Sequence, residues 1–195
     1  MSGNHTVAAI DCGTNSIRLL IASAGSDGRL VEQARELELV RLGEGVDATG
    51  AFRPDALERT FAACRSFAAM VEQHDCGQVR FVATSAARDV SNRNAFFAGV
   101  RQALGVDAEV IDGTEEARLS FAGAMSGVQV SDEPVLVIDC GGGSTELVLG
   151  RGTGIDSQVS INIGSVRLRE RFLHDDPPPV DQLAAARSYR RAARA

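Results

Sequence analysis

Two short segments of the sequence combine an aspartate, glycine and hydroxyl side chains in the same order. They are Asp11-Cys12-Gly13-Thr14-Asn15-Ser16 and Asp139-Cys140-Gly141-Gly142-Gly143-Ser144-Thr145-Glu146. Each follows a hydrophobic run typical of a buried strand. Glycine lets the backbone approach a ligand closely, and successive N–H groups in such a turn form a concave site for anions. The segments therefore predict phosphate-binding loops. For either loop taken alone, a tight hairpin with a solvated aspartate is the alternative.

The two loops belong to an internal repeat. A shift of 128 positions, the difference between Asp11 and Asp139, aligns the two segments and the strands around them. The aligned pairs are Val7 with Val135, Ile10 with Ile138, Cys12 with Cys140, Gly13 with Gly141, Ser16 with Ser144 and Leu19 with Leu147. Two unrelated strands share a few apolar residues by chance, but this match also includes Asp, Cys, Gly and Ser. The repeat indicates two related halves and favours phosphate binding for both loops.

The aspartates need a partner if phosphate binds beside them. Two like charges about 4 Å apart cost roughly 4 kcal/mol at an effective dielectric constant near 20. A divalent cation between carboxylate and phosphate reverses the sign of that interaction. Mg²⁺ is commonly held by one or two carboxylates together with phosphate oxygens. We therefore expect Asp11 and Asp139 to be Mg²⁺ ligands.

Strands and helices alternate along the chain, which favours an α/β fold. Strands are expected within 7–23 (two, separated by the first loop), 29–42, 79–84, 108–111, within 135–149 (two, separated by the second loop) and 158–163. Helices are expected over 54–74, 91–104, 114–125, 166–172 and 180–195. A polar stretch ending at Pro134 precedes the restart of the pattern. We therefore expect a first domain over 1–130 and a second over 131–195.

With these loops, the sequence resembles the actin, Hsp70 and sugar-kinase superfamily, in the form found in the exopolyphosphatase / guanosine pentaphosphate phosphatase (Ppx/GppA) family. Three more segments carry the resemblance: Ala83-Thr84-Ser85-Ala86-Ala87-Arg88, Ile111-Asp112-Gly113-Thr114-Glu115-Glu116-Ala117-Arg118 and Ile163-Gly164-Ser165-Val166-Arg167. The resemblance implies a duplicated actin-like (ribonuclease H-like) fold, complete in the first domain and partial in the second. Far fewer residues follow Val135 than precede it, so we expect a truncated chain. The second sheet would then lack helices to cover one face, and the chain would be unstable or would form a homodimer that covers it.

The resemblance also implies roles for individual residues. Glu116 corresponds to the general base that activates water, and Glu146 to a residue that holds Mg²⁺ or the attacking water. Arg88 corresponds to a ligand of the substrate phosphate. From the residues alone, Glu115 and Glu116 could simply be favoured by the dipole at the start of a helix. We expect that structural role for Glu115 and the catalytic one for Glu116.

The implied function is Mg²⁺-assisted hydrolysis of the terminal phosphoanhydride bond of inorganic polyphosphate or of guanosine pentaphosphate. Two alternatives stay open. One is a kinase-like phosphotransferase on the same fold, and the other is a non-catalytic remnant that binds polyphosphate or nucleotide, because the second domain is incomplete.

Composition excludes other classes. The net charge is −6 and all 20 basic residues are arginine, which argues against general nucleic-acid binding and leaves guanidinium as the side-chain cation for phosphate. No run of about 20 apolar residues suggests a membrane span, and we expect a cytoplasmic protein. The cysteines form no Cys-x-x-Cys pair, so we expect small, buried, reduced thiols rather than a zinc site or disulfides.

Overall fold

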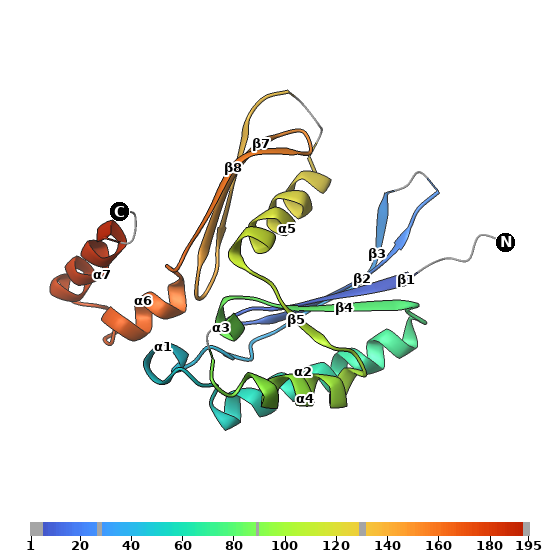
Figure 1. The fold of residues 1–195 in the computed structure, drawn as a ribbon, viewed down its shortest axis with the longest axis horizontal. Helices are drawn as coiled ribbons and strands as arrows, with labels where there is room; N and C mark the ends of the chain where they lie inside the picture. The colour runs from blue at the N-terminus through green and yellow to red at the C-terminus, as the bar shows by residue number, and fades with distance from the viewer. Residues whose placement is uncertain (1–5, 27–28, 89, 129–131, 193–195) are drawn as a thin grey trace. The chain divides into compact units, whose positions relative to one another are not determined.

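The computed structural model describes residues 6–26, 29–88, 90–128 and 132–192 (Figure 1). The chain divides into two compact units, Met1–Val110 and Ile111–Ala195, and each is described by itself. Among the described helices, none combines the length and the apolar character that a membrane crossing requires.

The first unit is built on a five-stranded sheet. Its strands are β1 (Thr6–Cys12), β2 (Ile17–Ala24), β3 (Leu30–Glu38), β4 (Gln78–Ala83) and β5 (Ala108–Val110), in the spatial order β3-β2-β1-β4-β5. The first three strands pair antiparallel, whereas β4 and β5 run parallel to β1. The predicted strands are confirmed. The third strand, however, ends at Glu38 rather than at Leu42, and the residues that follow it bind the first loop instead.

Helices α1 (Val46–Thr49), α2 (Pro54–Gln73), α3 (Ser85–Arg88) and α4 (Arg93–Leu104) belong to the same unit. Proline suits the first turn of α2, where its missing N–H costs no helical bond. Helices α2 and α4 pack side by side (Figure 1). The single-turn helices α1 and α3 were not predicted, because four residues are too few to show a helical period.

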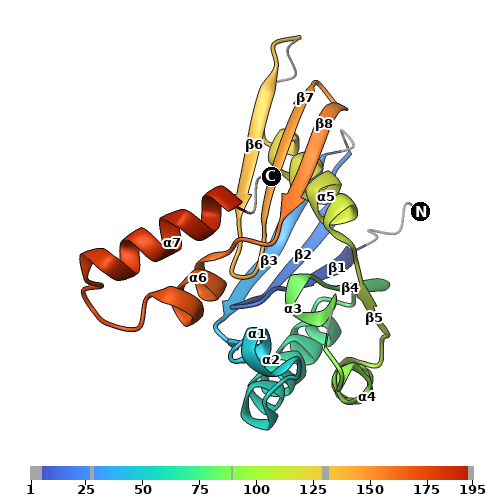
Figure 2. The ribbon, with the colours of Figure 1, turned by 60° about the vertical axis from the view of Figure 1, so that its left-hand side comes forward.

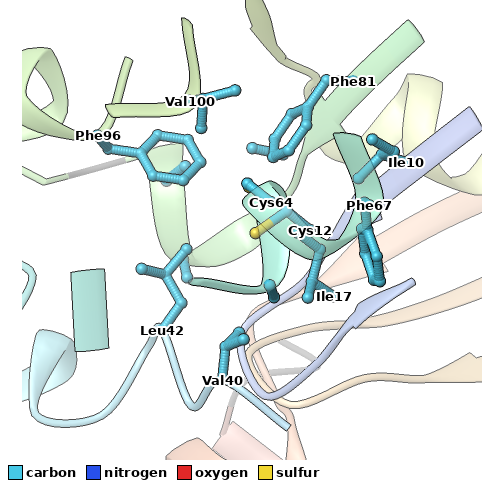
Figure 3. Close-up of a cluster of buried hydrophobic side chains, with 14 of the residues drawn as sticks. Ile10, Cys12, Ile17, Val40, Leu42, Cys64, Phe67, Phe81, Phe96 and Val100 are labelled. Atoms are coloured by element: carbon cyan, nitrogen blue, oxygen red, sulfur yellow. The ribbon is translucent and has the colours of Figure 1, made fainter. Parts of the chain in front are cut away.

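The core of the first unit lies between the sheet and its helices. Alternate residues of β1 point into it, as expected for a strand with one covered face. Figure 3 shows Ile10 and Phe81 from the sheet grouped with Phe67 from α2 and Phe96 from α4, and all four are almost fully buried. This core holds the ends of β1 and β4 that carry the first loop and α3.

The second unit repeats the first three strands. Strands β6 (Val135–Cys140), β7 (Thr145–Arg151) and β8 (Gly154–Ile161) form an antiparallel sheet in the order β6-β7-β8 (Figure 2). Helices α5 (Gly113–Ser126), α6 (Ser165–Phe172) and α7 (Val180–Ala192) complete the described part. The predicted end of the last helix, 193–195, lies outside the described residues. The duplicated fold expected from the repeat of the sequence is therefore present, with three strands in the second copy.

Helix α5 covers one face of this second sheet. Ala117, Phe121 and Met125 are buried against apolar residues of all three strands, namely Val135, Val137, Val148 and Ile155. The expected division after residue 130 assigned this helix to the first domain. By packing it groups with the second sheet, because that is where its apolar side is buried.

The other face of the second sheet carries apolar side chains that stay exposed. Residues alternate between the two faces of a strand, so Leu136, Ile138 and Cys140 share the face opposite Val135 and Val137. Leu136 and Ile138 are both more than half exposed, and Cys140 is exposed as well. The expectation of four buried thiols is therefore wrong for Cys140. It holds for Cys12 and Cys64, while Cys76 is partly exposed.

Candidate functional site

The two glycine loops share one hydrogen-bonding pattern. In the first, the Gly13 N–H donates to the carbonyl oxygen of Ser16 at 2.9 Å; in the second, the Gly141 N–H donates to that of Ser144 at 3.0 Å. The two bonds lie 128 residues apart, the offset of the repeat. Each loop is thus a short hairpin turn between two antiparallel strands, with its own bond across the turn.

The start of α6 holds the second loop from one side. The N–H groups of Ser165 and Val166 donate to the carbonyl oxygens of Gly141 and Gly142, at 3.0 Å each. Arg167 Nε donates to the carbonyl oxygen of Gly143, also at 3.0 Å. Three successive carbonyl groups of the loop are therefore bonded to the same segment.

This arrangement determines where the N–H groups of the second loop point. In a trans peptide the C=O and the following N–H point in opposite directions. The N–H groups of Gly142, Gly143 and Ser144 consequently point away from α6, and within the described residues they donate no backbone hydrogen bond. Three consecutive N–H groups on one side of a turn form the concave donor surface that phosphate oxygens require.

The first loop is held in a comparable way by the segment after β3. The N–H groups of Arg41 and Gly43 donate to the carbonyl oxygens of Asn15 and Thr14, at 2.8 Å each. A Cβ atom at Gly43 would collide with the side-chain methyl group of Thr14, so any other residue there would force Thr14 or the segment to shift. By the same trans-peptide geometry, the N–H groups of Asn15 and Ser16 point away from this segment.

The short helix α3, which ends at Arg88, begins beside the first loop. The ends of the parallel strands β1 and β4 are joined by a bond from the Thr84 N–H to the Cys12 carbonyl oxygen, at 3.1 Å. At the start of α3, Ser85 Oγ is 2.9 Å from Thr14 Oγ1. The structure therefore brings the segment that carries Arg88 to the first loop. Its role as a phosphate ligand stays a prediction.

Asp11 has a basic neighbour across the hairpin. It stands opposite Arg18 in the register of β1 and β2, and their closest charged atoms are 3.7 Å apart. Both side chains are about half exposed. A surface ion pair of this kind contributes about 0–1 kcal/mol, so it does not prevent Asp11 from binding a cation, and the Mg²⁺ role stays a prediction.

The equivalent pair in the second hairpin has a different charge. Asp139 stands opposite Glu146 in the register of β6 and β7, where the first hairpin has Asp11 and Arg18. Glu146 is only 1% exposed. Directly opposite side chains of an antiparallel pair lie on the same face with Cβ atoms about 4.5–5.5 Å apart, where like charges repel. This pair of carboxylates therefore requires compensation.

Two serine hydroxyls supply part of it. Ser120 Oγ, from α5, donates to Asp139 Oδ2 at 2.6 Å, and Ser160 Oγ, from β8, donates to Glu146 Oε1 at 2.7 Å. Neither serine was identified from the sequence. The local signal was the spacing of Ser120, which is four residues after Glu116 and therefore on the same side of the helix. For Ser160 no local signal exists, since its contact depends on the pairing of β7 with β8.

The start of α5 separates the two neighbouring glutamates. Asp112 caps the helix by accepting a hydrogen bond from the Glu115 N–H at 2.8 Å. Glu115 forms a two-point ion pair with Arg118, at 2.7 and 2.8 Å, and the bond raises the pKa of the Arg118 guanidinium. Glu115 is thus engaged by a residue of its own helix, and the structural role expected of it stays a prediction. Glu116 shares its side of the helix with Ser120, and its catalytic role remains to be tested.

The donor set of the second unit fits a magnesium ion. Within the described residues no group of three or more His, Cys, Asp and Glu side chains is gathered. Two carboxylates on one face of a sheet, beside a loop with outward N–H groups, match an ion that completes its shell with water and phosphate. Gln158 Oε1, on the same face of β8, is buried and lacks a hydrogen-bond donor among the described residues, so it requires water.

The chain is similar to several known proteins. Residues 21–193 match the Ppx/GppA phosphatase family. The chain is 52% identical over 189 residues to exopolyphosphatase 2 of Mycobacterium tuberculosis, with 93% of this chain and 59% of that protein covered. It is 36% identical over 176 residues to a bifunctional 3-dehydroquinate synthase/phosphatase of Fusobacterium nucleatum, covering 87% of this chain and 26% of that protein.

Solved structures give the same result. An exopolyphosphatase from Cytophaga hutchinsonii has a TM-score of 0.90 at 32% identity, over 96% of this chain and 60% of that one. A Ppx/GppA family member from Aquifex aeolicus has a TM-score of 0.75 at 32% identity, over 92% and 58%. The chain therefore spans about three-fifths of the length of these two proteins and of exopolyphosphatase 2, and about a quarter of the bifunctional protein. Because the family match extends over most of its residues, the chain belongs to the Ppx/GppA phosphatase family.

Proposed function

We propose that this chain serves Mg²⁺-assisted hydrolysis of the terminal phosphoanhydride bond of inorganic polyphosphate. The observation that carries the proposal is the second loop, whose carbonyl groups are bonded to α6 and whose N–H groups of Gly142, Gly143 and Ser144 point the other way. Such a loop binds the oxygens of a phosphoryl group without regard to what lies beyond them. The substrate class is taken from relatives whose names state an exopolyphosphatase.

In this proposal the residues of the chain bind the terminal phosphoryl group, hold the cation and deprotonate the attacking water. The loop N–H groups stabilise the charge on the oxygens of the terminal phosphoryl group. Arg88, at the end of α3, is proposed as a guanidinium ligand of the substrate phosphate. Asp139 and Glu146 hold the cation, which neutralises charge on the phosphate oxygens when it is bound.

Glu116 accepts a proton from the attacking water. The new bond forms between the water oxygen and the terminal phosphorus, while the bond from that phosphorus to the bridging oxygen breaks. The bridging oxygen leaves with its electron pair on the shortened polyphosphate, and inorganic phosphate is the other product. A base positioned in this way contributes about 10²–10⁴-fold in rate.

The direct test is release of inorganic phosphate from polyphosphate by this chain, with Mg²⁺ present and after chelation. Release that requires Mg²⁺ and no nucleotide is the expected result. Transfer of phosphate to an acceptor instead of water would indicate a phosphotransferase. Tight binding of polyphosphate without turnover at any Mg²⁺ concentration would overturn hydrolysis for this chain.

Guanosine pentaphosphate is the second substrate in the proposal, because it also ends in a phosphoanhydride and the sequence resemblance includes guanosine pentaphosphate phosphatases. The two substrates are compared in the same assay by their kcat/KM values. Contacts to the rest of the substrate decide the preference, whereas the loop N–H groups treat the terminal phosphate of both alike.

A further inference from the structure

We propose that Ser120 and Ser160 are positioning residues that hold Asp139 and Glu146 in the orientation needed to bind a divalent cation. The inference rests on the proposed function, since that function assigns the two carboxylates to the cation. It adds two side chains that bind neither substrate nor cation themselves.

The four side chains follow one another in order across the second unit. Ser120 on α5 bonds Asp139 on β6, Asp139 pairs in register with Glu146 on β7, and Glu146 pairs with Ser160 on β8. The hydroxyl bonds are 2.6 and 2.7 Å long, typical of an O–H donor to a charged oxygen. The row therefore has a donor at each end and two acceptors in the middle.

The hydroxyls solve a problem that the register creates. Two carboxylates directly opposite each other repel, so each side chain alone would rotate away from the other. A bond to Asp139 Oδ2 from the helix and one to Glu146 Oε1 from the next strand restrict that rotation. The two serine bonds use one oxygen of each carboxylate, so Asp139 Oδ1 and Glu146 Oε2 are not engaged by them.

The second hairpin has two acidic side chains opposite each other, as a cation site requires, whereas the first hairpin does not. There the residue opposite Asp11 is Arg18, so the protein supplies the positive charge itself. In the second hairpin the residue opposite is an acid that is almost fully buried, and only neutral hydroxyls bond the pair. Neutral donors leave the charge of both carboxylates available to a cation.

The helix links this row to the reaction. Ser120 lies one turn after Glu116 on the same side of α5, so a single helix carries both the proposed base and the hydroxyl that orients Asp139. Ala117 and Phe121, the residues between and beside them, are buried against the sheet and anchor the helix at this level. The base and the cation ligands are therefore set relative to each other by one rigid element.

The test measures binding of Mg²⁺, and of Mn²⁺ as a spectroscopic probe, to the full chain without substrate. Ser120→Ala and Ser160→Ala should each lower the affinity for the cation by about 10–100-fold, the usual effect of removing a side chain that orients a metal ligand. Ser160→Thr keeps the hydroxyl in a strand that tolerates β-branched residues, and should retain affinity close to that of the wild type.

Matched controls lie on the same elements. Ser126 on α5 donates to the Gly123 carbonyl oxygen, and Ser157 on β8 is exposed on the other face of the sheet. Ser126→Ala and Ser157→Ala should leave the cation affinity unchanged. Folding of each variant is checked by its melting temperature in the absence of metal.

The outcomes separate this inference from the proposed function. Serine-dependent cation binding without phosphate release would support the positioning role and remove the hydrolase assignment. If folded Ser120→Ala and Ser160→Ala bind Mn²⁺ as tightly as the wild type, the positioning role is overturned, whether or not polyphosphate is hydrolysed. If Ser120→Ala does not fold, the Mn²⁺ affinities of Ser160→Ala and Ser160→Thr are compared instead, and equal affinities overturn the positioning role.

Discussion

Asp139 lies directly opposite Glu146 on one face of the second sheet, at the register position that Asp11 and Arg18 occupy in the first. The two copies thus share the loop but differ at this position, which is basic in the first and acidic in the second. In the first hairpin the aspartate faces the guanidinium of Arg18, and in the second it faces the carboxylate of Glu146. This difference supports the proposal that Asp139 and Glu146 together hold a cation, while the role of Asp11 as a cation ligand stays a prediction.

Replacing Glu116 by Gln should abolish turnover and leave phosphate binding nearly intact. The amide keeps the size of the side chain but cannot accept a proton from water. We expect kcat to fall about 10²–10⁴-fold, or roughly 3–5 kcal/mol of barrier. Single-turnover kinetics on polyphosphate measure the loss.

Glu115→Gln is the matched control, because Glu115 is engaged with Arg118. This substitution should remove only the ion pair with Arg118 and the favourable interaction of the carboxylate with the helix dipole. The latter contributes of order 0.3–1 kcal/mol to stability. Equal losses of kcat for the two variants would mean that the base is misassigned.

Asp139→Asn should weaken the Mg²⁺-dependent binding of inorganic phosphate. The variant retains an oxygen that can accept from Ser120 but loses the charge that attracts the cation. Calorimetric titrations of phosphate at fixed Mg²⁺ give the affinity. Unchanged affinities for both ions would contradict the assignment of Asp139 as a cation ligand.

Gly164→Ala should destabilise the second loop. A Cβ atom at this position would collide with the backbone of Gly142 and Gly143, so the start of α6 would have to move away from the carbonyl groups it binds. Overpacking of this kind costs about 1–3 kcal/mol, and phosphate affinity should fall with it. Urea unfolding and phosphate titration measure the two effects.

Gly123→Ala on α5 is the control for that substitution, since open space surrounds its Cβ position. Alanine in a helix interior should stabilise the chain by about 0.4–1 kcal/mol. A Gly164→Ala chain as stable as the wild type would show that the close approach is not required.

The cysteines should react with a thiol reagent in an order set by burial. Cys140 is exposed and should be labelled first, followed by Cys76. Burial raises the pKa of the Cys12 thiol and raises that of Cys64 to about 12, so neither forms the reactive thiolate at pH 8. Mass spectrometry of the folded and the urea-unfolded chain measures the order. Labelling of Cys12 as fast as Cys140 in the folded chain would show that the first hairpin opens.

The sequence alone was enough to identify the two loops and the strands on either side of them. The offset of the repeat could be read from Asp11 and Asp139, and the hydrogen bonds of Gly13 and Gly141 follow the same offset. Local chemistry decides such features: glycine for the turn, alternating apolar residues for the strand and a proline at the start of α2. The family and the α/β fold follow from them.

Tertiary structure decided what surrounds the loops. Glu146 is buried and Cys140 is exposed because α5 covers one face of the second sheet and not the other. The residues next to them in the sequence do not indicate which face the helix covers. Ser120 and Ser160 reach their carboxylates across 19 and 14 residues, through the packing of α5 and the register of β8. A contact of that kind depends on how distant elements pair, so only the folded chain reveals it.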